Sequence, residues 1–200
     1  MDLAELLSGN PEEAAPQLLG SYLTSLVGGT TVKARVIEVE AYKGSDDPAS
    51  HAFRGRTRRN GSMFERPGTL YVYHSYGIHW CANVACGPEG VGWGILFRGA
   101  EIVEGVGLAR SRRGRDDQLA NGPGKLTQAL GIDHSLNGGY LFDDSFPIRL
   151  EPGPPPDLVM ATPRVGISQA RDRPWRFVAV TSANGPVGGG KTPRLPSARR

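Results

Sequence analysis

The sequence predicts a single mixed α/β (α+β) domain with short helices and long loops. Its 200 residues suit one domain with its own hydrophobic core. Glycine (28 residues) and proline (16 residues) are abundant, which favours loops and limits the length of helices. A segment with helical spacing of apolar residues, 10–27, precedes β-rich runs at 31–42 and 67–86. We therefore expect one domain over residues 1–183, followed by a flexible basic tail over 184–200.

The first predicted element is a helix over residues 10–27. Asn10 can cap it, Pro11 suits the first helical position, and two acidic residues follow in the first turn. Leucines and one tyrosine recur at helical spacing and form an apolar face, and a glycine pair ends the helix. A β-strand is expected next, at 31–42.

The strand at 31–42 carries two glutamates where apolar residues are expected. Val32 and Val36 assign one face of the strand to the core, yet Glu38 and Glu40 continue in the same phase. Either the strand leaves the core here and both acids are solvated, or a carboxylate stands at a cleft. A glutamate with restricted access to solvent has a raised pKa and can act as a general base. Periodicity does not choose between Glu38 and Glu40.

Residues 43–66 lack periodicity and predict a long ordered loop, which in a compact domain is typical of a functional segment. The loop contains His51 and, at 54–59, four arginines. Another four arginines lie at 110–115. Arginine suits bidentate contacts with phosphates, and a solvated basic face is the simpler alternative.

Residues 67–86 predict a β-hairpin that holds three of the six tyrosines. Alternation places Tyr71 and Tyr73 on one face of its first strand. Tyr76-Gly77 is the expected tight connection, so Tyr76 projects from the tip. An aromatic tip beside concentrated positive charge indicates nucleic-acid binding. The alternative is a core hairpin whose tyrosines only pack.

The rest of the chain predicts further strands and short helices. A buried strand covers 92–101 with Arg98 near its end, where an arginine needs a carboxylate, a phosphate or solvent. The following elements are expected in order: a short helix at 102–113, a turn and helix at 121–131, a proline-rich connector at 151–163, and an arginine-rich loop from 164 that leads into a closing strand from Trp175.

Charge and cysteine content narrow the function classes. The first 32 residues hold four of the 20 acidic residues and none of the 23 Lys and Arg residues, so the remainder of the chain is strongly basic. No apolar run is long enough to span a membrane, and the acidic N-terminus lacks the basic start of a secretory signal. Cys81 and Cys86 are too few for a disulfide framework, and their odd offset points them to opposite strand faces. We expect a cytoplasmic protein without a membrane partner.

Two motifs are considered and set aside. GPVGGGKT at 185–192 fits the phosphate-loop pattern, but Pro193 follows at once. No helix can then form to receive phosphates, and we expect no nucleotide cofactor. The histidines and cysteines of the loop and hairpin show neither C-x-x-C nor H-x-E spacing, so we expect no metal site.

Residues 36–84 carry a combination of motifs that resembles the alkyladenine (3-methyladenine) DNA glycosylase family. In order, these are E-x-E-A-Y, a histidine nine residues after its tyrosine, R-N-x-x-M-F, and P-G-x-L-Y-x-Y-x-x-Y-G. ILFRGAE at 95–101, NGPGKLTQALGI at 121–132 and PRVGISQARDRPWRF at 163–177 also match. Because the combination is far more specific than any one motif, the chain is identified as a bacterial member of this family.

The resemblance implies a curved antiparallel sheet within the mixed α/β domain, and it implies catalytic roles for three positions. Glu40, the second acid of E-x-E-A-Y, matches the catalytic base. Arg98 and the backbone of Val165 match the groups that hold the attacking water beside it.

The resemblance also implies which residues receive the damaged base and the DNA. Three aromatic residues match the walls that stack on the extruded base: Tyr42, His51 and Tyr73. Asn83 matches the side chain that disfavours the 2-amino group of guanine, and Tyr76 matches the residue that wedges into the minor groove. Ile78 stands where vertebrate relatives have methionine, a difference that bears on which lesions are preferred.

The implied function is a monomeric DNA glycosylase that flips alkylated or deaminated purines out of double-stranded DNA and leaves an abasic site. It needs no cofactor, and it has no lyase activity because no lysine matches a Schiff-base position. Two alternatives stay open. A catalytically inert damaged-DNA-binding domain would have no need of Glu40. A metal-dependent nuclease would use Glu38 and Glu40 with Asp46 and Asp47.

Overall fold

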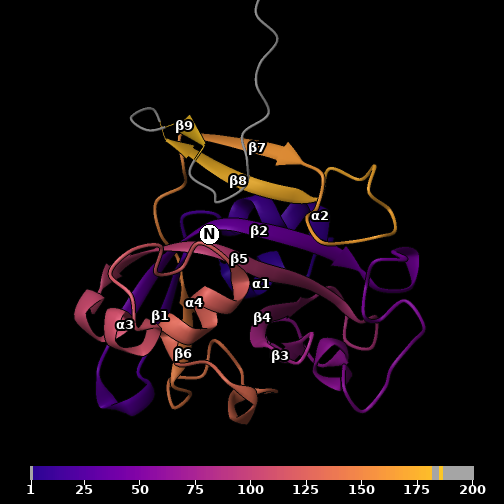
Figure 1. The fold of residues 1–200 in the computed structure, drawn as a ribbon. Helices are drawn as coiled ribbons and strands as arrows, with labels where there is room; N and C mark the ends of the chain where they lie inside the picture. The colour runs from indigo at the N-terminus through magenta and orange to yellow at the C-terminus, as the bar shows by residue number, and fades with distance from the viewer. Residues whose placement is uncertain (1, 182–184, 187–200) are drawn as a thin grey trace, which may run out of the picture.

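The computed structural model describes residues 2–181 and 185–186, which form a single domain around one antiparallel sheet (Figure 1). The strands follow the order β3-β4-β5-β2-β1-β6, and β8 joins β2, β7 and β9. The predicted mixed α/β class is confirmed. The strands are β1 Tyr22–Ser25, β2 Val32–Lys43, β3 Leu70–Ser75, β4 His79–Cys86, β5 Trp93–Glu104, β6 Ile148–Glu151, β7 Leu158–Thr162, β8 Arg176–Thr181 and β9 Gly185–Pro186.

The helices are short, as the glycine and proline content predicts. The α-helices are α1 Leu3–Leu7, α2 Pro11–Ala14, α3 Val106–Arg113 and α4 Pro123–Leu130. Single 3-10 turns lie at Ala15–Leu18, Val27–Gly29, Gly44–Asp46, Gly61–Phe64 and His134–Leu136. Two of the helices cover strands of the sheet: α2 packs against β2, and α4 packs against β4 and β5.

The predicted helix over 10–27 is wrong beyond its first turns. Pro11 does occupy the start of α2, but the Asn10 side chain makes no capping hydrogen bond. At a second proline, Pro16, the α-helix gives way to the 3-10 turn Ala15–Leu18, and Gly20 then turns the chain at φ +91° against the carbonyl of Pro154. The segment after Gly20 becomes β1, because β2 and β6 each offer it an edge for backbone hydrogen bonds. Helical spacing of leucines did not reveal this long-range pairing.

The long central strand β2 confirms the prediction for 31–42, but the phase of its side chains does not stay constant. A β-bulge interrupts the pairing with β5 between Val36 and Val39. Core residues before the bulge share the phase of Val36, whereas after it Ile37 and Val39 belong to the core. The bulge therefore moves Glu38 and Glu40 to the opposite face of the sheet. The expectation that both glutamates share the face of Val36 is wrong for this reason.

The middle of the chain follows the predicted order with shifted boundaries. Strand β5 runs past residue 101 to Glu104, so Arg98 lies inside the strand and not at its end. Gly105, at φ +72°, ends the strand and starts α3. Helix α4 ends at Gly131 as predicted, and β8 begins one residue after Trp175. The predicted connector at 151–163 contains a strand, β7, which pairs with β8.

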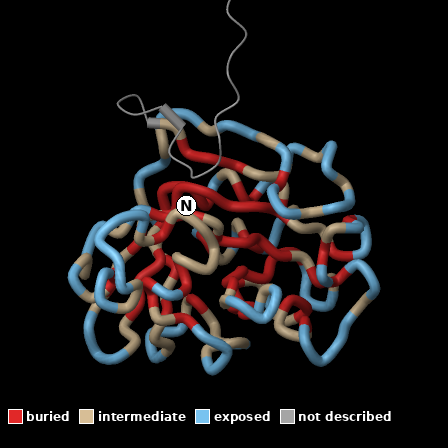
Figure 2. The backbone as a smooth tube through the Cα atoms, viewed as in Figure 1, coloured by how far each residue is buried: buried red, intermediate tan, exposed pale blue. Residues whose placement is uncertain are grey.

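Buried residues concentrate in the strands at the centre of the molecule, and exposed residues in the peripheral loops (Figure 2). The buried apolar residues form a main core on one side of the sheet and a smaller cluster on the other. The small cluster consists of Ala52, Met63, Phe64 and Tyr71. Its first three members come from the predicted long loop 43–66, which is thus ordered by its own buried side chains. Cys86 belongs to the main core and Cys81 faces away from it, and both thiols are free, as predicted.

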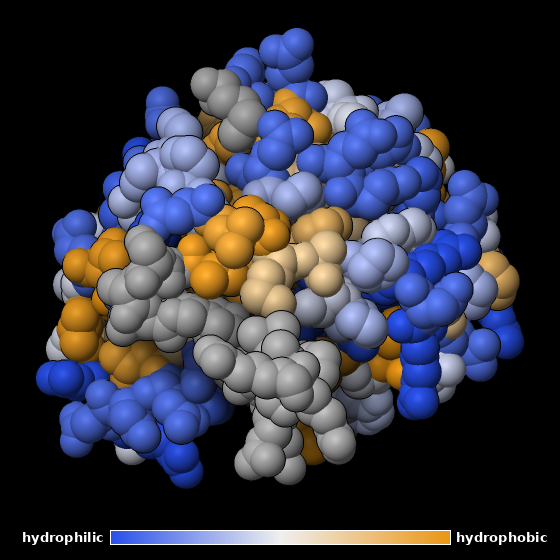
Figure 3. Space-filling view, turned by 90° about the horizontal axis from the view of Figure 1, so that it is seen from above, coloured by the Kyte–Doolittle hydropathy of each residue, from blue (hydrophilic) through white to orange (hydrophobic). Residues whose placement is uncertain are grey.

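The expectations for the C-terminal tail fall outside the described residues, except that Gly185–Pro186 pair with β8. No helix among the described residues is long and apolar enough to cross a membrane. The face formed by β7 and β8 is mostly polar around a central apolar area (Figure 3). On this side of the sheet, Leu158 and Met160 of β7 are exposed.

Candidate functional site

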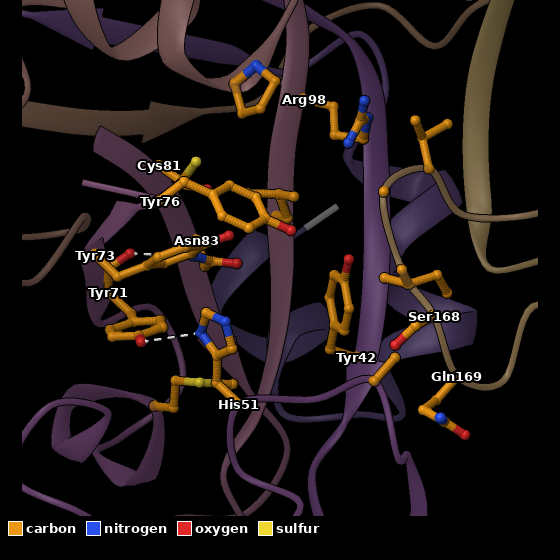
Figure 4. Close-up of a pocket in the computed structure, with 18 of the residues that line it drawn as sticks. Tyr42, His51, Tyr71, Tyr73, Tyr76, Cys81, Asn83, Arg98, Ser168 and Gln169 are labelled. Atoms are coloured by element: carbon orange, nitrogen blue, oxygen red, sulfur yellow. Dashed lines mark hydrogen bonds between the residues drawn. The ribbon is translucent and has the colours of Figure 1, made fainter. Parts of the chain in front are cut away.

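The candidate site is a pocket of about 650 Å³ on the face of the sheet that points away from the main core (Figure 4). Alternate residues of four neighbouring strands reach it: Tyr71 and Tyr73 from β3, Cys81 and Asn83 from β4, Leu96 and Arg98 from β5, and Tyr42 from β2. The segment 165–169, before β8, closes the side of the pocket beyond β2. Strand alternation therefore builds the core and the pocket from the same four strands.

Aromatic rings form the two walls of the pocket. Tyr71 and Tyr73 stack with their ring centroids 5.5 Å apart, and the His51 ring meets Tyr73 edge-on at 4.4 Å. Nδ1 of His51 lies 3.2 Å from the hydroxyl of Tyr71, which fixes the orientation of the imidazole. Tyr42 faces these rings from the opposite side of the pocket (Figure 4).

These walls are uncharged near neutral pH. Burial raises the pKa of Tyr71 to about 12 and raises that of Tyr73 still further. Burial also lowers the pKa of His51, and the nearby charge of Arg59 lowers it too. Asn83 adds a polar group from the neighbouring strand, and its amide donates to the carbonyl of Tyr71 at 3.3 Å.

Glu40 lies directly beside this pocket and is completely buried. Its Oε1 accepts a hydrogen bond from the backbone N–H of Val165 at 2.8 Å, and its Oε2 accepts one from the Tyr42 hydroxyl at 2.8 Å. Burial raises the pKa of Glu40, although the charge of Arg98 and these two hydrogen bonds act in the other direction. A carboxylate with a raised pKa is suited to take a proton from a bound group.

Arg98 connects Glu40 to the second glutamate of the strand. Its Nε lies 2.9 Å from Oε1 of Glu38 and 3.5 Å from Oε1 of Glu40. Although burial alone would lower the pKa of Arg98, the charges of the two glutamates raise it, so the guanidinium stays charged. Glu38 also accepts from Nε of Arg176 on β8 at 2.6 Å. The two buried acids are thus neutralised by two arginines.

A buried ion pair holds the segment that supplies the Val165 N–H. Arg164 forms two hydrogen bonds with the carboxylate of Asp47, at 2.5 and 2.8 Å, and both side chains are fully buried. Arg164 also donates to the carbonyl of Ala41 and lies over the ring of Tyr42, 4.6 Å from its centroid. The pair therefore ties the loops that follow β2 and precede β8 to each other and to the pocket wall.

The tip of the β3–β4 hairpin stands at the mouth of the pocket. Tyr76 and Gly77 both have positive φ, 49° and 67°, the combination of a type I′ turn. The Tyr76 side chain is 87% exposed, yet it also lines the pocket. Ile78 beside it is 78% exposed. A large exposed side chain held on a strained backbone is typical of a functional position.

Comparison with known proteins shows the family of this chain. The sequence model described as methylpurine-DNA glycosylase matches residues 5–183. The chain belongs to the methylpurine-DNA glycosylase family. A protein of Mycobacterium tuberculosis named "Putative 3-methyladenine DNA glycosylase" is 50% identical over 182 residues, 87% of each chain. Proteins of the same name in Mycolicibacterium paratuberculosis and Rhodococcus jostii are 46% and 45% identical, over 88% of this chain and 87% and 80% of theirs.

The site of this methylpurine-DNA glycosylase family member brings the sequence-predicted residues together. They form two groups: the pocket with its aromatic walls, and the exposed tip formed by Tyr76 and Ile78. Sequence reasoning missed the importance of Asp47 and Arg164, because their pairing joins positions 117 residues apart. It also assigned no role to Tyr71, although strand alternation already placed that residue beside Tyr73.

The arrangement of acids does not favour a metal-dependent nuclease. Glu38 and Asp47 are paired with arginines, Glu40 accepts two hydrogen bonds and lies 3.5 Å from Arg98, and Asp46 is exposed. Within the part of the chain that the structure describes, no group of three or more His, Cys, Asp or Glu is arranged to hold a metal ion.

We expect Asp47→Asn to destabilise the protein strongly. The substitution leaves the buried guanidinium of Arg164 without its charged partner, and breaking a buried pair in this way costs about 3–5 kcal/mol. Urea denaturation followed by circular dichroism measures the change in the free energy of unfolding. Asp46→Asn is the matched control, since the exposed neighbouring side chain should leave the midpoint nearly unchanged. Equal midpoints for the two variants would contradict the assignment.

Proposed function

We propose that this protein is a monofunctional DNA glycosylase, which flips alkylated and deaminated purines out of duplex DNA and hydrolyses the N-glycosylic bond. One observation carries the proposal: a fully buried glutamate, Glu40, lies beside an aromatic pocket of about 650 Å³. A protein that only binds DNA has no need to bury a carboxylate there, because burial of a charge is unfavourable. The names of the mycobacterial relatives support 3-methyladenine as one base of the substrate class.

The pocket suits a cationic, extruded purine. A base inside the double helix cannot be attacked at its sugar bond, so the nucleotide must leave the stack at a cost of a few kcal/mol. Tyr42 on one side and Tyr73 with His51 on the other offer the faces and edges of neutral rings. Alkylation at N3 or N7 makes a purine cationic, and the negative faces of aromatic rings attract cations. Asn83 borders the same space and disfavours the 2-amino group of an undamaged guanine.

The hydrolysis uses one water molecule and the buried carboxylate. Glu40 takes a proton from water as the water oxygen forms a bond with C1′ of the sugar. The bond between C1′ and the base nitrogen breaks, and its electron pair moves onto the cationic purine, which leaves as a neutral base. The family resemblance implies that Arg98 and the backbone of Val165 hold this water beside Glu40. Both groups also contact the carboxylate itself, Arg98 at 3.5 Å and the N–H of Val165 at 2.8 Å. A neutral lesion departs less readily, because its leaving nitrogen must also gain a proton.

The reaction ends at an abasic site without cleavage of the strand. A lyase needs an amine that forms a Schiff base with the sugar. The lining residues of the pocket, within the part of the chain that the structure describes, include no lysine. This supports water as the nucleophile. As the family resemblance implies, we also propose that the enzyme is a monomer and needs no cofactor.

Tyr76 maintains the flipped state in duplex DNA. Among the described residues it is the most exposed of the large apolar side chains, and it stands at the pocket mouth on the hairpin turn. Inserted into the minor groove, the ring fills the space that the flipped nucleotide leaves and keeps the duplex from closing.

Incubation of the protein with methylated duplex DNA in excess EDTA, followed by chromatography, tests the proposal. We expect release of free 3-methyladenine and 7-methylguanine, together with intact strands that break only on alkaline treatment. Glu40→Gln should bind the same DNA but excise roughly 10²–10⁴-fold more slowly, because an amide cannot accept the proton.

Glu101→Gln is the matched control for Glu40→Gln, since Glu101 is an exposed glutamate on the adjacent strand β5. It should excise at the rate of the unmodified protein. Binding of damaged DNA without any base release would favour the inert binding domain instead. Release that stops in EDTA would favour a metal-dependent enzyme.

We expect Tyr76→Ala to lower single-turnover excision from duplex DNA by roughly 10- to 100-fold, because the flipped state loses a plug that offsets part of the few kcal/mol of unstacking. The loss should be much smaller with a single-stranded substrate, which has no duplex to reclose. Ile78→Ala, at the same exposed tip, is the comparison and should have a smaller effect. A rate for Tyr76→Ala on paired DNA equal to that of the unmodified protein would refute the role.

The pH profile of excision should show an acid limb above pH 4.5, the ordinary value for glutamate. Burial raises the pKa of Glu40, and the carboxylate acts as a base only when ionised. Activity is therefore full at pH values above the raised pKa and falls as the pH drops through it. Single-turnover rates with 7-methylguanine, which departs without a general acid, measure this limb. A rate that stays constant down to pH 4.5 would be inconsistent with this base.

A further inference from the structure

We propose that Glu38 is a positioning residue for base excision, because it holds the Arg98 guanidinium in place and keeps it from pairing fully with Glu40. This inference rests on the proposed glycosylase function and extends it. From the sequence, Glu38 is one of two candidate bases and, in the nuclease alternative, a metal ligand. The structure separates the two: Glu40 contacts residues that line the pocket on both of its oxygens, whereas Glu38 binds two arginines.

The geometry favours Glu38 over Glu40 as the partner of Arg98. Nε of Arg98 lies 2.9 Å from Oε1 of Glu38, a hydrogen-bond distance, and 3.5 Å from Oε1 of Glu40. The Glu38 side chain is only 5% exposed, so water does not weaken this pair strongly. Arg98 is thus hydrogen-bonded to the Glu38 carboxylate, whereas its contact with the Glu40 carboxylate is longer.

The fold contains local features that place Glu38 at this position. Register shifts between β2 and β5 occur on both sides of Glu38, so the β-bulge brings this residue onto the pocket face. Gly99 is its partner across the strands, and a Cβ there would lie 3.3 Å from both Cβ and Oε2 of Glu38. The absence of a side chain at this position leaves the room that the carboxylate occupies. Arg176 of β8 holds the same carboxylate from the other edge of β2.

Within the described chain, the groups whose charges or hydrogen bonds act on Glu40 include one other acid, Glu38. The remaining groups are Tyr42 from β2, Arg98 from β5, Tyr73 from β3, and Arg164 with the N–H of Val165 from the loop before β8. Beyond these groups, Arg176 stands opposite Glu40 in the register of β2 and β8.

The consequence for Glu40 follows from the signs of these charges. The negative charge of Glu38 raises the pKa of Glu40, and the positive charge of Arg98 lowers it. If Glu38 were neutral, its own contribution would vanish and Arg98 would be free to move onto Glu40. Both changes lower the pKa of Glu40. A base with lower proton affinity takes a proton from water less readily, so its ionisation at lower pH would come with a lower maximal rate.

The test compares single-turnover excision of 7-methylguanine as a function of pH in Glu38→Gln, Glu38→Asp and the unmodified protein. For Glu38→Gln we expect the acid limb to move to lower pH, the plateau rate to fall roughly 10- to 100-fold through misplacement of Arg98, and the affinity for lesion-containing DNA to stay the same. Glu38→Asp restores the charge and should return the limb toward its original pH. A purely structural role would lower the plateau without moving the limb.

Arg176→Gln provides a second variant, for which we expect the acid limb to shift in the opposite direction. It removes a cation from the same cluster and leaves the negative charge of Glu38 less compensated, so the acid limb should move to higher pH. This variant decides the question if Glu38→Gln does not fold.

The outcomes distinguish a failure of the proposed glycosylase function from a failure of the role of Glu38. No base release by the unmodified protein means that the proposed function is wrong. Excision with an acid limb that neither Glu38→Gln nor Arg176→Gln moves, or that both move in the same direction, overturns the role of Glu38 and leaves the proposed function intact.

Discussion

Burial of the Glu40 carboxylate is the constraint on which the arrangement of the site depends. A charged group removed from water must find compensating donors, since an uncompensated buried charge costs several kcal/mol. Glu40 finds them in three different parts of the chain: Tyr42 on its own strand, Arg98 on β5, and the N–H of Val165 in the loop before β8. The same contacts that satisfy the carboxylate therefore bind that loop to the sheet and close one side of the pocket.

The sheet part of the pocket is the reverse face of the hydrophobic core. In β3, β4 and β5, core side chains alternate with pocket side chains. The packing of the core side chains therefore fixes the direction in which the pocket side chains point. Strand β2 reaches the same arrangement only through the bulge at Ile37, which moves Glu38 and Glu40 to the pocket face. Sites on such strands are held more firmly than sites on loops, which suits the proposed reaction, in which a carboxylate acts on one water molecule.

Arginines neutralise the remaining buried acids and at the same time connect distant segments. Glu38 joins β2 to β5 and β8 through Arg98 and Arg176, and Asp47 joins its loop to the one that carries Arg164. Buried pairs of this kind contribute little net stability compared with apolar contacts, because desolvation offsets most of their attraction. Their value in this protein lies in geometry: each pair determines where a backbone or side-chain donor meets Glu40 or Tyr42.

The sequence by itself determined the fold class, the hairpin with Tyr76 at its tip, and the shared face of Tyr71 and Tyr73, because these depend on local alternation and turn chemistry. Its combination of motifs also led to the family and to the proposed site residues. Only the tertiary structure decided that residues 22–25 form a strand, that a bulge places Glu38 and Glu40 on the pocket face, and that Asp47 pairs with Arg164. The physical reason is common to all three. Each depends on hydrogen bonds or charges from segments far along the chain, and local periodicity carries no information about which segments will meet.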